Sequence, residues 1–140
     1  TKAVPRLGIR PFRLTDGPRG VGFHSSGKRC TAFPSGIAQA ASWDEDLLAR
    51  FGAALGRECR AAGGRTILGP AINITRSPLN GRTFEYFSED PHLDSQLVVP
   101  IVKAVQEQMA KAQEEAAAEV AATTTLARAL LAYDECVMKP

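Results

Sequence analysis

The sequence predicts an α/β fold: a partial (β/α) barrel of about two βα units, followed by a long C-terminal helix. Two short apolar segments are each followed by a long loop and then by apolar residues at helical spacing. Strands that alternate with helices in this way are typical of a parallel sheet or barrel. A closed barrel needs eight such units, whereas this chain of 140 residues shows the pattern of two. Its 44% hydrophobic and 23% charged residues indicate a folded chain.

The first predicted strand is short. An apolar run at 12–14 leads into Thr15-Asp16-Gly17-Pro18, a strong stop signal, so we expect the strand to end at Asp16. Residues 17–36 then contain five glycines and two prolines. A loop of this length is more typical of a functional segment than of a simple connection.

The first long helix is predicted over 43–62. Ser42 is its expected N-cap, and the acids that follow favour the positive end of the helix dipole. Gly63-Gly64 predicts its end. Trp43 stands at the helix start, where we expect it to pack in the core; a sugar-stacking platform is the alternative.

The second strand is predicted at 66–68 and the second long helix after Pro91. Gly69-Pro70 ends the strand, residues 75–91 are expected to form a loop, and the acids before Pro91 favour a helix start. One apolar stripe then follows the helix: Leu93, Leu97, Ile101, Val105, Met109, Ala112, Ala116 and Val120, with Leu126, Leu130 and Leu131 beyond it. The β-branched residues 123–125 weaken a helix, so we expect a break there.

Charge and cysteine content exclude several classes of function. The net charge of +2 is too small to indicate nucleic acid as the main partner, and no apolar run approaches the roughly 20 residues of a membrane-spanning helix. Three cysteines without a CxxC motif do not form a disulfide framework, so we expect small buried residues. His24, Cys30, Cys59 and His92 lack the close pairs that zinc sites use. We therefore expect no metal and no cofactor, and the compartment stays open.

Both loops that follow the predicted strands carry charged and polar residues. In α/β folds, ligands bind at the carboxyl ends of the strands, in these loops. Residues 16–21 and 73–91 are therefore the expected site.

A specific series of motifs runs through the same segments. Its members are Leu14-Thr15-Asp16-Gly17-Pro18-Arg19-Gly20-Val21, Ala32–Ala38, Ala40–Asp44, Gly56-Arg57-Glu58, Leu68–Ile74 and Arg76–Pro91. Over about residues 5–108 this series resembles the N-terminal barrel domain of glycoside hydrolase family 3, mostly β-glucosidases and related exo-acting enzymes.

The resemblance implies roles for four residues. Asp16 would accept hydrogen bonds from the hydroxyls of the sugar in the −1 subsite, as an ionised carboxylate can; the alternative is a simple Asp-Gly-Pro turn. Arg76 would reach the same sugar with its forked guanidinium, or else pair with Glu85 or Asp90. Arg82 and Glu85 are expected to be structural, as an ion pair that holds the loop.

The resemblance ends near residue 108. Family members continue there into a strand, a Lys-His motif and later an Asp nucleophile, with the acid/base further on. This sequence has no Lys-His dipeptide, and residues 109–140 are rich in Ala and Glu. We therefore expect a domain over 1–108, a helical tail over 109–140 and no catalytic residue.

Three functions remain open at this point. The chain is a β-glucosidase-type head that binds a β-glucoside or monosaccharide weakly, a non-catalytic sugar-binding or self-associating structural module, or an unrelated hydrolase acting through its loops. Two βα units leave sheet edges open and a long apolar stripe uncovered, which favours a homo-oligomer. A tail that folds back at 123–125 is the local alternative.

Overall fold

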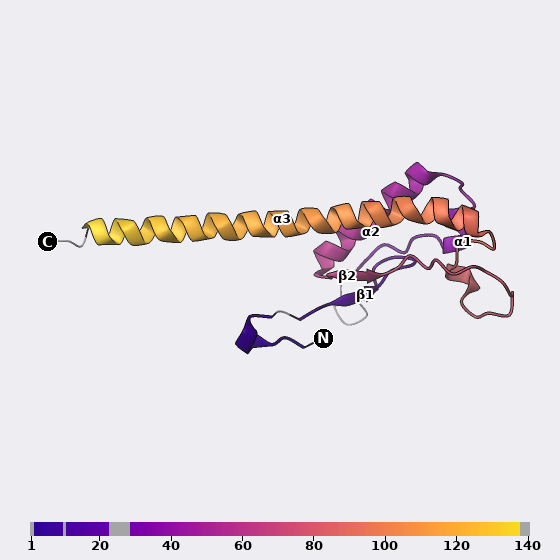
Figure 1. Cartoon of the computed structure of the whole chain (residues 1–140), viewed down its shortest axis with the longest axis horizontal. Helices are drawn as coiled ribbons and strands as arrows, with labels where there is room; N and C mark the ends of the chain where they lie inside the picture. Colours follow the sequence, from indigo (N-terminus) through magenta and orange to yellow (C-terminus); the bar gives the residue numbers. More distant parts are fainter. Residues whose placement is uncertain (1, 10, 23–28, 138–140) are drawn as a thin grey trace. The chain divides into compact units, whose positions relative to one another are not determined.

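The structure is a computed structural model that describes residues 2–9, 11–22 and 29–137, without the side chains of 112, 116 and 126–137. His24 lies outside this description, as do the side chains of Cys136 and of the leucines beyond residue 125. The elements follow in the order η1 (Pro5–Leu7), β1 (Leu14–Asp16), α1 (Gly36–Ala40), α2 (Glu45–Ala62), β2 (Thr66–Leu68), η2 (Thr83–Glu85) and α3 (Pro91–Val137) (Figure 1). The chain divides into two compact units, Thr1–Met109 and Ala110–Pro140.

The two strands pair in parallel, with Leu14 opposite Thr66 and Asp16 opposite Leu68. The chain crosses from one strand to the other through α1 and α2, so the predicted α/β class with two βα units is confirmed. A Gly-Pro dipeptide follows each strand, so Gly17 and Gly69 lie directly after the paired carboxyl ends. Their backbones lie so close that a Cβ atom at position 69 would be 3.1 Å from the Gly17 carbonyl carbon.

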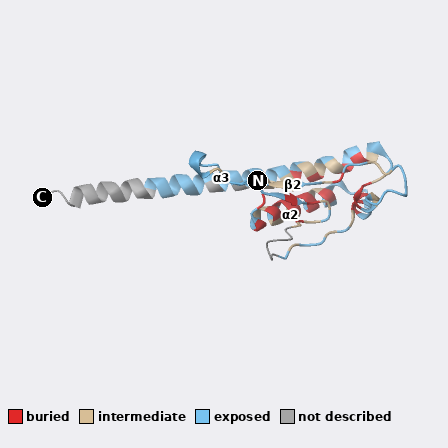
Figure 2. Ribbon diagram, turned by 90° about the horizontal axis from the view of Figure 1, so that it is seen from below, coloured by how far each residue is buried: buried red, intermediate tan, exposed pale blue. Residues whose placement is uncertain are grey.

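The core of the first unit lies between α2 and the first turns of α3. Leu48, Leu55 and Cys59 of α2 and Leu97 and Ile101 of α3 are each at most 2% exposed. Figure 2 shows buried positions on both helices. The first half of the predicted apolar stripe is therefore covered within the chain itself.

The start of α2 differs from the prediction. Asp44, and not Ser42, is the N-cap: its side chain accepts the Leu47 N–H at 2.8 Å, and the helix begins at Glu45. The Ser42 hydroxyl instead donates to the Gln39 carbonyl at 2.6 Å, which closes α1. The short helix α1 was not expected, because five residues carry too little periodicity to be recognised.

The prediction that Trp43 packs in the core is wrong. Trp43 is 73% exposed and has a φ of 55°. Its N–H continues the turn after α1 by donating to the Ala40 carbonyl. The left-handed backbone then breaks the path into α2 and leaves the indole outside the core. For a bulky residue this conformation costs on the order of 1–2 kcal/mol.

Glycines end α2 as predicted. Gly63 is left-handed with a φ of 83°, and the N–H groups of Gly63 and Gly64 donate to the carbonyls of Arg60 and Cys59. These two bonds satisfy carbonyls that the helix leaves open. The chain can then turn directly into β2.

The predicted start of α3 is also confirmed, and the predicted break is not. The Asp90 side chain accepts the His92 N–H at 2.8 Å, and Pro91 is the first helical residue. The helix continues through Thr123–Thr125, whose hydroxyls donate to the carbonyls four residues earlier. This bonding satisfies the hydroxyls within the helix, which continues through the three β-branched residues.

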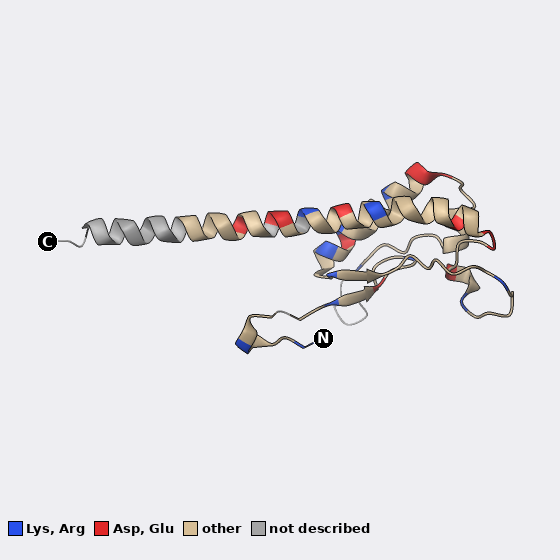
Figure 3. Cartoon of the chain, in the orientation of Figure 1, with Lys and Arg blue, Asp and Glu red and all other residues tan. Residues whose placement is uncertain are grey.

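Figure 3 shows that acidic residues recur along the described part of α3 in the second unit. They include Glu114, Glu115 and Glu119, beside the basic Lys111. Among the described residues no helix has the length and apolar character needed to cross a membrane. Cys59 is buried as expected, whereas Cys30 is half-buried, because it lies on a loop at the margin of the core.

Candidate functional site

Asp16 lies where the sequence predicts it, at the carboxyl end of β1. Along this strand only Thr15 is buried, at 3% exposure, whereas Leu14 and Asp16 are exposed. The alternation of a strand therefore directs Asp16 to the face opposite the core. Its carbonyl accepts the Gly22 N–H at 3.1 Å, so the following loop returns to the strand end.

The loop after β1 is anchored on α2. Glu58 accepts the Thr31 N–H at 2.9 Å on one carboxylate oxygen and the Thr31 hydroxyl on the other. The Phe33 N–H donates to the Arg19 carbonyl at 2.8 Å, which joins the two described ends of the loop. Glu58 therefore fixes the loop beside Asp16, a role that the sequence pattern did not indicate.

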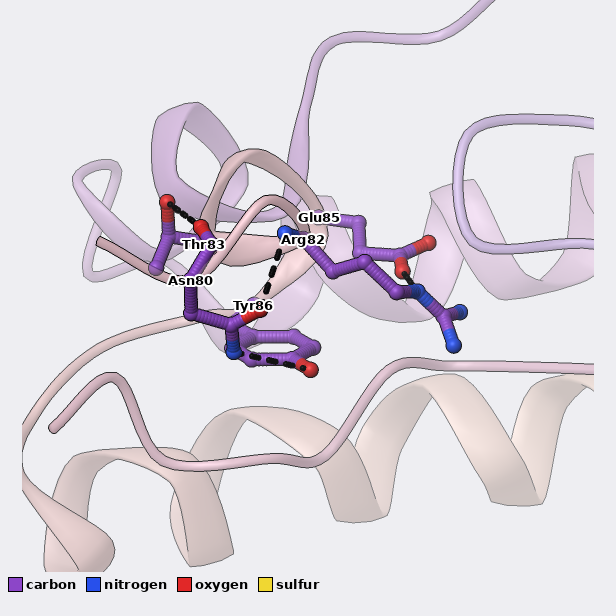
Figure 4. A network of polar contacts seen from close by, with 5 residues as sticks. All are labelled: Asn80, Arg82, Thr83, Glu85 and Tyr86. Atoms are coloured by element: carbon purple, nitrogen blue, oxygen red, sulfur yellow. Dashed lines mark hydrogen bonds and ion pairs between the residues drawn. The ribbon is translucent and has the colours of Figure 1, made fainter. Parts of the chain in front are cut away.

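The loop after β2 carries the predicted ion pair. Arg82 Nε donates to Glu85 Oε1; the Arg82 side chain is 69% exposed and that of Glu85 is 9% exposed (Figure 4). The hydrogen bond with Glu85, followed by the charge of Glu85, raises the pKa of Arg82. The pair is thus observed, and its role in holding the loop stays a prediction.

The charge of Asp16 also raises the pKa of Arg82, as a smaller contribution than that of Glu85. The two loops begin side by side, because β1 and β2 pair in parallel with Asp16 opposite Leu68 at their carboxyl ends.

A side-chain contact joins these two loops. The Arg19 guanidinium lies over the ring of Phe84, with Cζ 5.9 Å from the ring centre. This is the geometry of a cation–π interaction. Both residues are exposed, and they follow Asp16 and Arg82 by a few positions in the sequence. A single charged residue and a single aromatic residue on separate loops do not predict such a pair.

Asn80 organises the turn that carries Arg82. Its side-chain oxygen accepts the Arg82 N–H at 3.1 Å, and its amide nitrogen donates to the Tyr86 hydroxyl at 3.3 Å. The Thr83 hydroxyl donates to the Asn80 carbonyl at 3.2 Å (Figure 4). The Asn80-Gly81 dipeptide predicts a turn, but the sequence does not predict the hydrogen bonds that Asn80 makes within this loop.

Arg76 is exposed on the loop after β2. The two partners proposed for a purely structural Arg76 are engaged elsewhere: Glu85 pairs with Arg82, and Asp90 caps α3. The meeting of Asp16 and Arg76 at one sugar stays a prediction. Among the described residues no group of three or more His, Cys, Asp or Glu could hold a metal ion.

Comparison with known proteins decides the family. The profile described as "Glycosyl hydrolase family 3 N terminal domain" matches residues 2–125. This chain belongs to glycosyl hydrolase family 3. The match extends past residue 108, where the motif series ends, into the Ala- and Glu-rich segment.

Several relatives of this family 3 chain are β-glucosidases. It is 48% identical over 117 residues to thermostable beta-glucosidase B of Acetivibrio thermocellus, covering 77% of this chain and 16% of that protein. It is 43% identical over 111 residues to a beta-glucosidase of Rhizobium radiobacter, covering 77% and 14%. The chain thus spans about one sixth of the length of these relatives.

Solved structures show the same relationship. Beta-glucosidase 3B of Thermotoga neapolitana in complex with glucose aligns with a TM-score of 0.70 and 43% identity, over 77% of this chain and 16% of that one. The beta-glucosidase of Kluyveromyces marxianus in complex with glucose aligns with a TM-score of 0.71 and 40% identity, over 76% and 13%. Both alignments cover about three quarters of this chain and only a small part of the neighbour.

Proposed function

We propose that this chain is the sugar-binding head of a β-glucosidase-type glycoside hydrolase, which acts on terminal O-glycosidic bonds. The observation that carries the proposal is the meeting of the loops after β1 and β2, where the Arg19 guanidinium lies over the Phe84 ring, 5.9 Å from its centre. Both loops lie at the carboxyl ends of the strands, the usual ligand-binding edge of this architecture.

Asp16 and Arg76 divide the recognition of one sugar ring between them. The Asp16 carboxylate accepts hydrogen bonds from two neighbouring hydroxyls, and the Arg76 guanidinium donates two parallel bonds to hydroxyl oxygens. Arg82 and Glu85 hold the second loop in place. Arg82 is a poor substitute for Arg76 in binding the sugar. If Arg82 left the ion pair, the buried Glu85 carboxylate would lose its partner.

We infer that the chain alone does not hydrolyse glycosides. A retaining glycosidase needs two carboxyl groups about 5–5.5 Å apart, one as nucleophile and one as acid/base. Glu85 is held by Arg82 and is a poor candidate for either role. The relatives are about six times longer than the matched segment, and the resemblance assigns the nucleophile and the acid/base to that further sequence.

A binding titration tests the proposal. Glucose binding to the 140-residue chain is followed by NMR, beside release of p-nitrophenol from p-nitrophenyl β-glucoside. We expect saturable binding without turnover, and Asp16→Asn should weaken binding by about 1–3 kcal/mol, the loss of charge-assisted hydrogen bonds. Unchanged glucose affinity in Asp16→Asn would reject the assignment. Turnover by the wild-type chain that disappears in this variant would overturn the non-catalytic reading.

Self-association is the second candidate function, favoured by exposed apolar side chains. Leu14 and Leu68 on the paired strands are 48% and 50% exposed, and Val120 on α3 is 62% exposed. A symmetric dimer would cover such surface. Sedimentation at micromolar concentration should show a dimer that Val120→Glu dissociates. Val105→Glu would instead disturb the chain's own core, against which Val105 packs. A folded wild-type monomer of 15.0 kDa would refute this candidate.

A further inference from the structure

Trp43 is the sole tryptophan of the chain and is displayed in an unusual way. It is 73% exposed, and its φ of 55° places a bulky residue in the left-handed region. Such outliers persist only where the surrounding structure enforces them, and they cluster at functional sites. Here the enforcing bonds are those that close α1, in which the N–H groups of Ser42 and Trp43 donate to the Gln39 and Ala40 carbonyls.

A cavity of about 320 Å³ lies beside this tryptophan, within the first unit. Its lining is mostly apolar and comes from α1, from the end of the loop after β2 and from the first turn of α3. Besides Trp43 it includes Ile37, Ala40, Phe87 and Leu93. The volume is at the lower end of the range of small-molecule sites, about 300–1,000 Å³.

The same cavity has polar groups that the fold does not use. Glu89 lines it, is exposed, and has no ion-pair partner among the described residues. Thr75 lines it too, and its hydroxyl oxygen is buried without a hydrogen-bond partner in the described part of the chain. The cavity thus combines an aromatic platform, an apolar floor and a free carboxylate at its rim.

We propose that this cavity is a second saccharide site, which takes one pyranose ring of a glucoside. The C–H face of the ring packs on the Trp43 indole, and a ring hydroxyl donates to the Glu89 carboxylate. An apolar partner helix fits less well, because it would bury the Glu89 carboxylate without a counter-charge. Asp16 and Arg76 are not among the described lining residues, so this site is distinct from the one proposed above.

The sole tryptophan makes the proposal directly measurable. Methyl β-D-glucopyranoside is titrated into the full 140-residue chain up to about 100 mM, which exceeds the millimolar Kd of a weak site. Trp43 fluorescence and its indole N–H resonance are recorded. We expect a saturable change in both, which persists in Asp16→Asn. Mannitol, which has similar hydroxyls but no ring face, should give none.

Three variants locate the ligand. Trp43→Ala should weaken binding about tenfold in ligand-detected NMR, the loss of one stacking surface, and Glu89→Gln should weaken it less. Trp43→Phe keeps a smaller ring and should bind with intermediate affinity, which separates loss of stacking from loss of folding.

Four results would overturn the second site. These are no Trp43 response to the glucoside, an equal response to mannitol, a response that disappears in Asp16→Asn, and unchanged affinity in a folded Trp43→Ala variant. The third result would show that Trp43 only reports occupancy at Asp16, so failure of this site is distinguishable from failure of the proposed function. An apolar dye that binds beside Trp43 when the glucoside does not would assign the cavity to a partner surface.

Discussion

Gly52 on α2 lies against the backbone of Ile101 on α3, so closely that a Cβ atom at position 52 would be 2.5 Å from the Ile101 carbonyl oxygen. Four residues later, a Cβ atom at Gly56 would be 2.8 Å from Gln108 Cβ. Two glycines one turn apart on the same helix face therefore set the distance between α2 and α3. This close approach allows Leu48, Leu55 and Ile101 to share one core.

Gly52→Ala should destabilise the fold. Alanine gains about 1 kcal/mol of helix propensity over glycine, but the clash with a backbone atom should cost more, about 1–3 kcal/mol and at the upper end of that range. We expect a net loss of about 1–2 kcal/mol in the free energy of unfolding, measured by urea denaturation. Gly81→Ala is the control, because a Cβ atom there meets open space. Equal stability of the two variants would contradict the close packing.

The structure and the sequence pattern assign different residues as the N-cap of α2, Asp44 and Ser42. Asp44→Ala should lower the free energy of unfolding by about 1 kcal/mol, because it removes the acceptor of the Leu47 N–H. Ser42→Ala should cost less, at the low end of the range of about 0.5–1.5 kcal/mol for a single hydrogen bond, because it removes the bond to the Gln39 carbonyl that closes α1 and leaves the cap of α2 in place. A larger loss in Ser42→Ala would restore the cap that the sequence predicts. Thermal melts followed by circular dichroism make the comparison.

Asp94 gives the stability of the fold a defined pH dependence. Burial raises the pKa of its carboxyl above the ordinary value of 3.8, and the hydrogen bond from Ser88 opposes this in part. Between 3.8 and the raised pKa, the folded chain therefore holds a proton that the unfolded chain has lost. Within that interval stability should fall as pH rises, by up to about 1.4 kcal/mol per pH unit.

Two variants test this linkage. Asp94→Asn should remove that part of the slope and raise stability at pH 7, because a neutral amide avoids the cost of burying a charged carboxylate. The amide oxygen can still accept the Ser88 hydroxyl. Ser88→Ala should raise the pKa of Asp94 further, as read from its carboxyl carbon by NMR. If Asp94→Asn leaves the pH profile of unfolding unchanged, the carboxyl does not titrate differently in the folded chain.

Arg76 should require its guanidinium for sugar binding. We expect Arg76→Lys to bind glucose as weakly as Arg76→Ala, because an ammonium group is a point charge and cannot form two parallel hydrogen bonds. Affinities from NMR titration of the three proteins decide this. Full binding by Arg76→Lys would show that the residue contributes only charge.

Much of this protein follows from its sequence alone, where the signal is local. The strand that ends at Asp16, the glycine end of α2 and the start of α3 at Pro91 depend on turn and capping chemistry within a few residues. The motif series likewise indicates the family that the comparisons show. The position of Asp16 at the end of β1 and that of Arg76 in the loop after β2 follow from the same kind of signal.

The tertiary structure alone decided which side chains meet and which stay outside. Trp43 has the sequence environment of a core residue, yet a single left-handed φ after α1 exposes it beside a cavity. Glu58 fixes Thr31 across 27 positions, and Arg19 meets Phe84 across two loops. No periodic pattern encodes such contacts, because they depend on where separate backbone segments come together. The glycines that allow α2 and α3 to approach show the same limit: their residue type is visible in the sequence, and the partner that requires it is not.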